Sequence, residues 1–319
     1  MPAVITLGEL LIDFVSTRAG VSLEEAPAFE KAAGGAPANV AVGTARLGVT
    51  SAFLGKVGED AFGRFLARTL KENGVDISGL CFSREARTML AFVSLQASGE
   101  RDFEFYRSPS ADILYTPEEV HTALLQQARV FHFGSISLIS EPSRSATLYA
   151  VETARQAGAL ISYDPNLRLN LWADEHAARE GIRLGWPLAH VIKVSEEELA
   201  FLSGMEDITQ GAQALWHPEL KLLVVTRGKD GCAYFTPDFN GEIPGFPVHA
   251  VDTTGAGDGF VAGMLAGLSE QLLASLDQTR LHEILRFANA VGALTTTRRG
   301  AIPALPRRQE VEAFLAQAG

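Results

Sequence analysis

The chain has 319 residues, of which 47% are hydrophobic, and its formal net charge at pH 7 is −11. This composition excludes a disordered chain, and no apolar run approaches the roughly 20 residues that span a bilayer. The acidic balance, without a basic stripe, argues against nucleic acid as a partner. We expect no signal peptide. Two isolated cysteines, Cys81 and Cys232, have neither metal-ligand spacing nor a disulfide framework, which favours a cytoplasmic protein.

The first residues predict a buried strand. Residues 4–14 are apolar on both faces at first, as a central strand of a parallel sheet would be, and Asp13 lies near the far end. Asp13 is either a solvated strand terminus or a carboxylate that accepts hydrogen bonds from substrate hydroxyls. Residues 49–57 predict another strand, and residues 60–73 predict a helix with one apolar face.

A glycine pair opens the first predicted helix. Gly34 and Gly35 precede a segment of helical character over residues 36–47, and Pro37 suits the first turn of that helix. The small residues let a ligand approach the backbone. Asn39 is either a capping residue or a ligand contact, and the sequence does not separate the two.

A small β-layer is predicted outside the main sheet. Residues 89–95 and 102–107 alternate in polarity around a turn at residues 98–100, which is typical of a hairpin. Together with strand-like pieces in residues 16–33, this hairpin would form a separate layer.

From about residue 117 the pattern alternates strictly between helix and strand. Helices are predicted at residues 117–127, 141–157, 174–185 and 196–202, and strands at residues 130–133, 160–164, 190–194 and 222–226. Two more helices, at about 280–297 and 307–317, close the chain. Alternation of this kind predicts a parallel sheet with helices on both faces, whose ligands lie at the carboxyl ends of the strands. Asp13, Asp164, Thr226 and Asp252 are expected there. Without repeats or long linkers, residues 1–319 are expected to form one domain.

A glycine-rich turn near residue 255 is the expected centre of the chemistry. Residues 246–251 predict a strand, and a helix begins at the glycines of residues 255–257. The N–H groups of such a turn and the positive helix end form an anion site. Asp258 either complements the helix dipole or acts as a general base toward an attacking hydroxyl. Spacing alone leaves both readings open.

Two further segments carry charged residues after strands. Arg168 is either a phosphate ligand or a member of a surface ion pair. Ser195 is a good N-cap, and Glu198 is the acidic residue expected to organise Mg²⁺, through waters.

Two motifs carry a family resemblance that runs nearly end to end. Residues 34–39 (GGAPAN) and 252–258 (DTTGAGD) resemble the signature regions of the ribokinase-like sugar kinases, also called the phosphofructokinase-B family. Within that family, the stretches most similar to bacterial fructokinases are residues 53–58, 99–103, 105–112 and 193–198. The resemblance implies a three-layer α/β/α sandwich with a mostly parallel central sheet and a small β-sheet lid.

The resemblance also implies a role for each matching residue. It implies ATP-dependent transfer of phosphate to a sugar hydroxyl, with Asp258 as the catalytic base. The implied anion hole consists of the amides of Gly255, Ala256 and Gly257. The positions that match sugar contacts are Asp13, Gly34, Gly35, Asn39, Arg107, Arg168 and Asp258. The positions that match the nucleotide site are Lys193, Thr226, Gly228, Gly231, Gly257 and Asn289.

Two cations are implied as well. Glu198 matches the Mg²⁺ position of an Asn-x-x-Glu motif, although Ser195 stands here where the family often has asparagine. A monovalent cation, usually K⁺, would be held by Asp252 and Thr254 with carbonyls of Thr295, Arg298 and Gly300. Segments 15–33 and 87–112 would form the lid, which in this family often pairs with a second subunit into a homodimer.

The substrate stays open at this level. D-fructose, phosphorylated to fructose 6-phosphate, is the first expectation. Another small polyol is the alternative: 2-keto-3-deoxygluconate, ribose, a nucleoside or a phosphorylated ketose. A non-catalytic regulator that binds sugar or nucleotide is the alternative from another class.

Overall fold

The structure is a computed structural model that describes residues 2–18, 20–95, 101–270 and 277–318. None of the described helices is long and apolar enough to cross a membrane.

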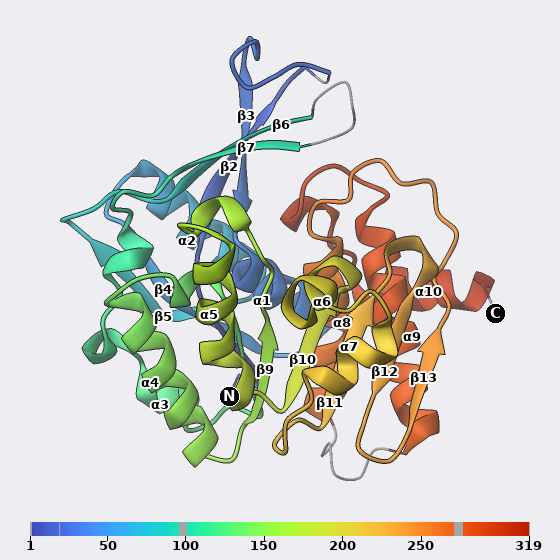
Figure 1. The fold of residues 1–319 in the computed structure, drawn as a ribbon. Coiled ribbons are helices and arrows are strands. Elements are labelled where there is room, and N and C mark those ends of the chain that lie inside the picture. The colour runs from blue at the N-terminus through green and yellow to red at the C-terminus, as the bar shows by residue number, and fades with distance from the viewer. Residues whose placement is uncertain (1, 19, 96–100, 271–276, 319) are drawn as a thin grey trace.

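The elements follow one another in the order that Figure 1 shows. The strands are β1 Val4–Leu7, β2 Leu11–Ser16, β3 Phe29–Gly34, β4 Ser51–Gly58, β5 Asp76–Ser83, β6 Leu90–Leu95, β7 Arg101–Tyr106, β8 Val130–Gly134, β9 Leu160–Asp164, β10 Val191–Ser195, β11 Leu222–Thr226, β12 Cys232–Phe235 and β13 Asn240–Ile243. The helices are α1 Ala36–Arg46, α2 Ala61–Glu72, α3 Thr122–Leu125, α4 Ser143–Gln156, α5 Glu175–Gly185, α6 Glu196–Ser203, α7 Ile208–Ala214, α8 Ala256–Glu270, α9 Gln278–Thr295 and α10 Arg308–Ala318.

The central sheet has nine strands in the order β13-β12-β11-β10-β9-β8-β1-β4-β5. From β11 to β5 every neighbouring pair is parallel, while β12 and β13 join antiparallel at one edge. Helices cover both faces of this sheet (Figure 1). The expected three-layer α/β/α fold with a mostly parallel sheet is therefore confirmed.

Successive side chains of the central strands pack into two separate hydrophobic cores, one on each face of the sheet. On β11, Leu223 and Val225 belong to a core with residues of α4, α5 and α6, whereas Leu222 and Val224 pack with residues of α8 and α9. Side chains of a strand alternate between the two faces of its sheet. A strand buried on both faces must be apolar throughout, which explains the continuous apolar runs in the sequence.

A second sheet of four strands, in the order β3-β2-β6-β7, stands apart from the first. In Figure 1 its strands rise toward the top of the molecule, and Phe14 of β2 packs against Phe62 of α2. Its strands β6 and β7 pair antiparallel, as the predicted hairpin requires. The turn expected at residues 98–100 lies outside the described residues.

The single strand predicted for residues 4–14 is wrong. The chain forms β1 in the central sheet and β2 in the small sheet, with Gly8, Glu9 and Leu10 between them. The chain turns at Gly8, where the Cβ of any other residue would lie 2.6 Å from Pro37. Asp13 therefore lies on β2, opposite Ala32, and not at the end of a central strand.

Other boundaries also differ from expectation. Residues 246–251 form no strand, since Pro247 cannot donate to a ladder, and the segment ends at Val251, which is 53% exposed. Asp252 consequently follows a loop. The helix predicted over residues 117–127 is a 3-10 turn, Pro117–Glu119, followed by the short α3. Strand β5 and helix α7 were not predicted.

Candidate active site

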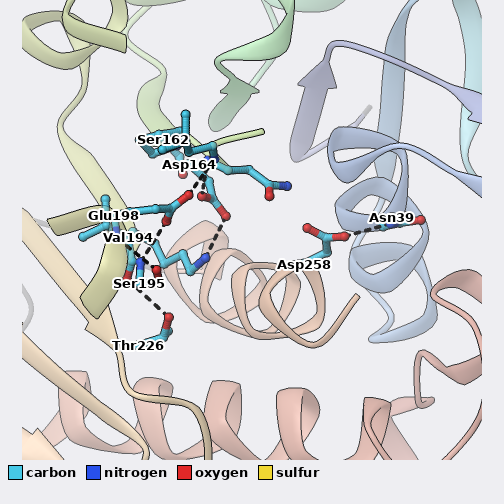
Figure 2. Close-up of polar contacts among 12 residues, drawn as sticks. Asn39, Ser162, Asp164, Val194, Ser195, Glu198, Thr226 and Asp258 are labelled. Carbon is cyan, nitrogen blue, oxygen red and sulfur yellow. Dashed lines mark hydrogen bonds and ion pairs between the residues drawn. The ribbon is translucent and has the colours of Figure 1, made fainter. Parts of the chain in front are cut away.

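Polar side chains gather where the central strands β9, β10 and β11 end. Asp164 is the last residue of β9, Ser195 the last of β10 and Thr226 the last of β11. Ser195 and Thr226 lie opposite each other in the parallel register, and the Thr226 hydroxyl donates to the Val194 carbonyl at 3.3 Å. Figure 2 shows these strand ends facing the first turn of α8.

Glycine is required at the turn that begins α8. Gly255 has a positive φ of 76°, and a Cβ there would lie 2.8 Å from the side chain of Ala301. The N–H of Ala256 donates to the carbonyl of Thr253 at 3.3 Å, a long bond that a stronger acceptor can replace. Two helical residues further on comes Asp258, which places its carboxylate at the positive end of the helix.

Asp258 has the environment of a base and not of a solvated helix cap. Its side chain is buried, with the residue only 9% exposed, and its Oδ2 accepts a hydrogen bond of 2.8 Å from Asn39 Nδ2 (Figure 2). Burial raises the pKa of Asp258 to about 6, and Asp164 adds to the rise, while Asn39, Arg168 and Lys193 oppose it. A carboxylate with this pKa is ionised at neutral pH and still basic enough to accept a proton.

Asn39 brings an unused polar atom to the site. It lies in the first turn of α1 and is buried, and its Oδ1 accepts no hydrogen bond from the part of the chain that the structure describes. Buried polar atoms are normally paired, so an unpaired acceptor beside the Asp258 carboxylate fits a ligand donor such as a hydroxyl. Of the two functions left open by the sequence, the structure excludes capping, because Gly35 is the N-cap of α1 and the Asn39 side chain donates to Asp258.

Lys193 connects the strand ends to the glycine turn. Its Nζ forms a buried ion pair of 3.1 Å with Asp164 Oδ2. The same ammonium lies 3.2 Å from the point where a side chain at Gly257 would begin. Burial alone would lower the pKa of Lys193, but Asp164, Glu198 and Asp258 outweigh it and raise that pKa. The lysine therefore carries a positive charge beside the N-terminus of α8. The sequence placed Asp164 at a strand end but did not predict this pair.

A hollow of about 420 Å³ opens beside Lys193, and Arg168 and Glu198 are among the residues that line it. Both carboxylate oxygens of Glu198 accept backbone hydrogen bonds, one from Leu167 at 2.6 Å and one from Ser195 at 2.8 Å. With Ser195 it forms a capping box at the start of α6. Across the described ranges, no three acidic, His or Cys side chains are grouped to hold a metal ion alone. Glu198 fits Mg²⁺ only through its remaining lone pairs, which suits contact through water.

The residues expected around the nucleotide follow β11. Gly228 and Gly231 have positive φ values of 54° and 95°, and a Cβ at Gly231 would lie 2.0 Å from the carbonyl of Ile243. Asn289, buried in α9, donates to the carbonyls of Ile243 and Pro244, each at 3.3 Å. Asn289 thus fixes the segment after β13 against the Gly228–Asp230 turn.

The loop expected to hold a monovalent cation is closed by Asp252. Its Oδ1 accepts from the N–H and the hydroxyl of Thr254, at 2.9 and 2.7 Å, and its Oδ2 accepts from the N–H of Gly300 at 2.9 Å. These bonds join two loops at the start of α8 and the end of α9. The Thr295 hydroxyl donates to the Val291 carbonyl within α9, and the Arg298 side chain pairs with Glu310.

The two arginines expected at the sugar lie in different surroundings. Arg107 is buried, with its Nε 2.9 Å from Asp112 Oδ2 and its Nη2 donating to the Ile136 carbonyl at 3.1 Å. Arg168 donates to the Leu167 carbonyl at 3.0 Å and acts electrostatically on Asp258. Asp13 lies against the glycine pair, because a Cβ at Gly34 would overlap its carboxylate.

A doubly covered parallel sheet with a buried carboxylate, an ammonium group and a helix N-terminus near its strand ends fits the class of phosphotransferases that act on an alcohol. The model of the pfkB family carbohydrate kinases matches residues 1–308. The chain belongs to this family.

Individual relatives cover nearly the whole chain. "Probable fructokinase-7" of Arabidopsis thaliana is 56% identical over 315 residues, or 98% of this chain and 92% of the relative. A fructokinase from Xylella fastidiosa solved with bound ATP is 38% identical, with a TM-score of 0.92 over 100% of this chain and 99% of the other. A double mutant of the fructokinase from Vibrio cholerae O395, bound to fructose, ADP and potassium ion, is 38% identical, with a TM-score of 0.90 over 99% and 98%.

Proposed function

We propose that this protein is an ATP-dependent fructokinase, which transfers the γ-phosphate of ATP to D-fructose and forms fructose 6-phosphate. The observation that carries the proposal is the position of Asp258. Its buried carboxylate stands at the N-terminus of α8, held by Asn39 and close to the ammonium of Lys193. The relatives named above as fructokinases are similar to this chain over nearly its full length.

The mechanism follows from the residues of this chain. Asp258 accepts the proton of the attacking hydroxyl, and Asn39 holds the carboxylate in place while its free Oδ1 accepts from the sugar. The N–H groups of Gly255, Ala256 and Gly257 and the positive end of α8 stabilise the transferring phosphoryl group. Lys193, beside Gly257, neutralises charge on the phosphates. Asp13, Gly34 and Gly35 line the sugar side.

The nucleotide and the cations occupy the second half of the sheet. ATP lies against Thr226, Gly228 and Gly231, with Asn289 behind the loop. Glu198 would hold Mg²⁺ through water, and the ion would supply positive charge to the phosphates of ATP. The loop that Asp252 closes, with Thr254 and the carbonyls of Thr295, Arg298 and Gly300, would hold K⁺.

The small sheet is the proposed lid. Residues 15–33 and 87–112 cover the sugar, which excludes water as a competing acceptor, and the lid pairs with a second copy in a homodimer. The remainder of residues 1–319 is a single domain. The cytoplasm is the proposed compartment, which suits the two free thiols of Cys81 and Cys232.

One observation favours a neutral sugar over a sugar acid such as 2-keto-3-deoxygluconate. The sequence left acidic substrates open because two arginines were expected at the sugar. Arg107 is already neutralised by Asp112 in a buried ion pair, so it has little charge left for a substrate carboxylate. The intact Asp258 site likewise disfavours a non-catalytic regulator.

A sugar panel tests the proposal. Release of ADP is measured with fructose, ribose, 2-keto-3-deoxygluconate, a nucleoside and a phosphorylated ketose, each with ATP, Mg²⁺ and K⁺. We expect the highest kcat/KM with fructose. A higher kcat/KM with any other sugar would overturn the choice of fructose, and no sugar-dependent ADP release at all would overturn the kinase.

A further inference from the structure

Glu9 is a buried carboxyl group without a part in the mechanism described above. It lies between β1 and β2, where the chain leaves the central sheet for the small sheet, and it is 3% exposed. Its Oε1 accepts a hydrogen bond of 2.8 Å from the N–H of Ala36, the first residue of α1. That residue is where the chain comes back from the small sheet. Glu9 therefore joins the outgoing crossing to the returning one.

The bond from Ala36 supplies a cap that α1 lacks locally. Gly35 stands at the N-cap position and has no side chain, so a first-turn N–H would otherwise need another acceptor. The backbone packs closely at the same point, since a Cβ at Gly35 would lie 2.3 Å from the carbonyl oxygen of Glu9. The start of α1 is thus defined by the backbone and the side chain of one residue.

The chain crosses between the two sheets a second time, before β6 and after β7, and these two segments also lie near Glu9. The N–H of Ala111 donates to the carbonyl of Arg87 at 2.8 Å, which ties the segment entering β6 to the segment leaving β7. Asp112, the next residue, holds Arg107 and lines one small cavity of about 10 Å³ together with Glu9. All four chain crossings between the two sheets therefore lie around one buried polar cluster.

The start of α1 bears directly on the site. Asn39 follows Ala36 by three residues, about 4.5 Å along the helix axis, and donates to Asp258 at 2.8 Å. A shift of the first turn of α1 therefore moves the group that orients the base. We propose that Glu9 is a positioning residue of the sugar kinase reaction: by accepting the Ala36 N–H it sets where α1 begins, and so aligns Asn39 with Asp258 and the sugar. This inference rests on the proposed function.

The hydrogen bond that Glu9 accepts and the charge that it carries can be tested separately. Burial raises the pKa of Glu9 to about 7, while the backbone N–H groups of Glu9 and Ala36 oppose the rise. The contact that the structure shows is a hydrogen bond from the Ala36 N–H, and a neutral acceptor oxygen can accept that bond as well. Glutamine keeps an acceptor oxygen at the same reach, whereas aspartate keeps the charge but is one methylene too short.

Two matched variants test the proposal. Glu9→Gln should keep kcat/KM for fructose within about 3-fold of wild type, because the amide oxygen still accepts the Ala36 N–H. Glu9→Asp should lower it by about 10- to 100-fold, with KM for ATP nearly unchanged, because the first turn of α1 is displaced. Hydrogen exchange at Ala36 should be faster in Glu9→Asp alone. Asp207→Ala, which removes the cap of α7, controls for a lost cap away from the site.

Each outcome decides the proposal. Fructose kinetics of Glu9→Asp equal to wild type would overturn it, and so would an equal loss in Glu9→Gln, because an acceptor oxygen at the same reach would then not be sufficient. Loss of the circular dichroism spectrum of the folded protein in either variant would make the role one of stability and overturn it too. Failure of the proposed function is distinguishable, because the wild type would then release no ADP with any sugar.

Discussion

Replacing Asp258 by asparagine should make the protein more stable while it removes the base. The carboxyl is buried, and its pKa rises from 3.8 to about 6 on folding. The difference between these two values corresponds to about 3 kcal/mol, an upper limit for the cost of keeping the carboxylate ionised in the fold. Asparagine carries no charge and can still accept from Asn39, so Asp258→Asn avoids this cost.

The pH dependence gives the sign of the effect. A carboxyl whose pKa is raised in the fold contributes stability that is present below 3.8 and lost as the pH rises through about 6. We therefore expect Asp258→Asn to raise the free energy of unfolding by up to about 3 kcal/mol at pH 8 and by little at pH 4.

Urea unfolding of wild type and Asp258→Asn between pH 4 and pH 8 measures this difference. Asp60→Asn is a matched control of opposite sign: burial would raise the pKa of Asp60, but hydrogen bonds from Thr88 and Gly63 lower it overall. That variant should lose stability at pH 8. If Asp258→Asn were less stable than wild type at pH 8, the assignment of a strained, ionised Asp258 would be refuted.

Three further predictions concern activity. The kcat/KM for fructose should fall below pH 6 with a limb near the pKa of Asp258, and a profile flat to pH 5 would contradict this base. Asn39→Ala should move that acidic limb to higher pH, because the hydrogen bond from Asn39 lowers the pKa of Asp258. It should also reduce kcat/KM by about 10-fold or more. A limb at the wild-type pH would show that Asn39 does not act on Asp258. Lys193→Met should raise KM for ATP and leave Asp164 buried without its partner, with a lower melting temperature; unchanged ATP kinetics would exclude contact with the phosphates.

The alternating half of the fold was predictable because each local signal agreed with the final structure. Strands such as β11 are apolar on successive residues, and helices such as α5 and α6 directly follow Asp174 and Ser195, whose side chains cap them. These patterns depend on neighbours in sequence. They can therefore be recognised in the sequence without knowledge of the tertiary contacts.

The first strand was not predictable in the same way. Residues 4–14 are apolar on both sides of Gly8, so hydrophobicity does not reveal that β1 and β2 belong to different sheets. The break depends on the close packing of Gly8 against Pro37 and on the bond between Glu9 and Ala36, both of which are long-range contacts. The signal available in the sequence was Gly8 followed by the acidic Glu9, which interrupts the apolar run.

The sequence allows the residues of the candidate site to be proposed, but it does not show which side chains pair with one another. The glycine turn and Asp258 could be located from the sequence, because a helix start after glycines has a defined chemistry. The pair of Lys193 with Asp164 and the hydrogen bond from Arg107 to the Ile136 carbonyl each join residues that lie 29 positions apart in the chain. Only the fold brings those segments together, which is why Arg107 looked available to a substrate.

Sugar-dependent formation of ADP by wild type and Asp258→Asn, at pH 7.5 with fructose, ATP, Mg²⁺ and K⁺, is the most direct test of a buried general base at the start of α8. We expect turnover by the wild type and a loss of about 10²- to 10⁴-fold in kcat for the variant, with the Kd for fructose retained. A variant that turns over fructose at nearly the wild-type rate would contradict it.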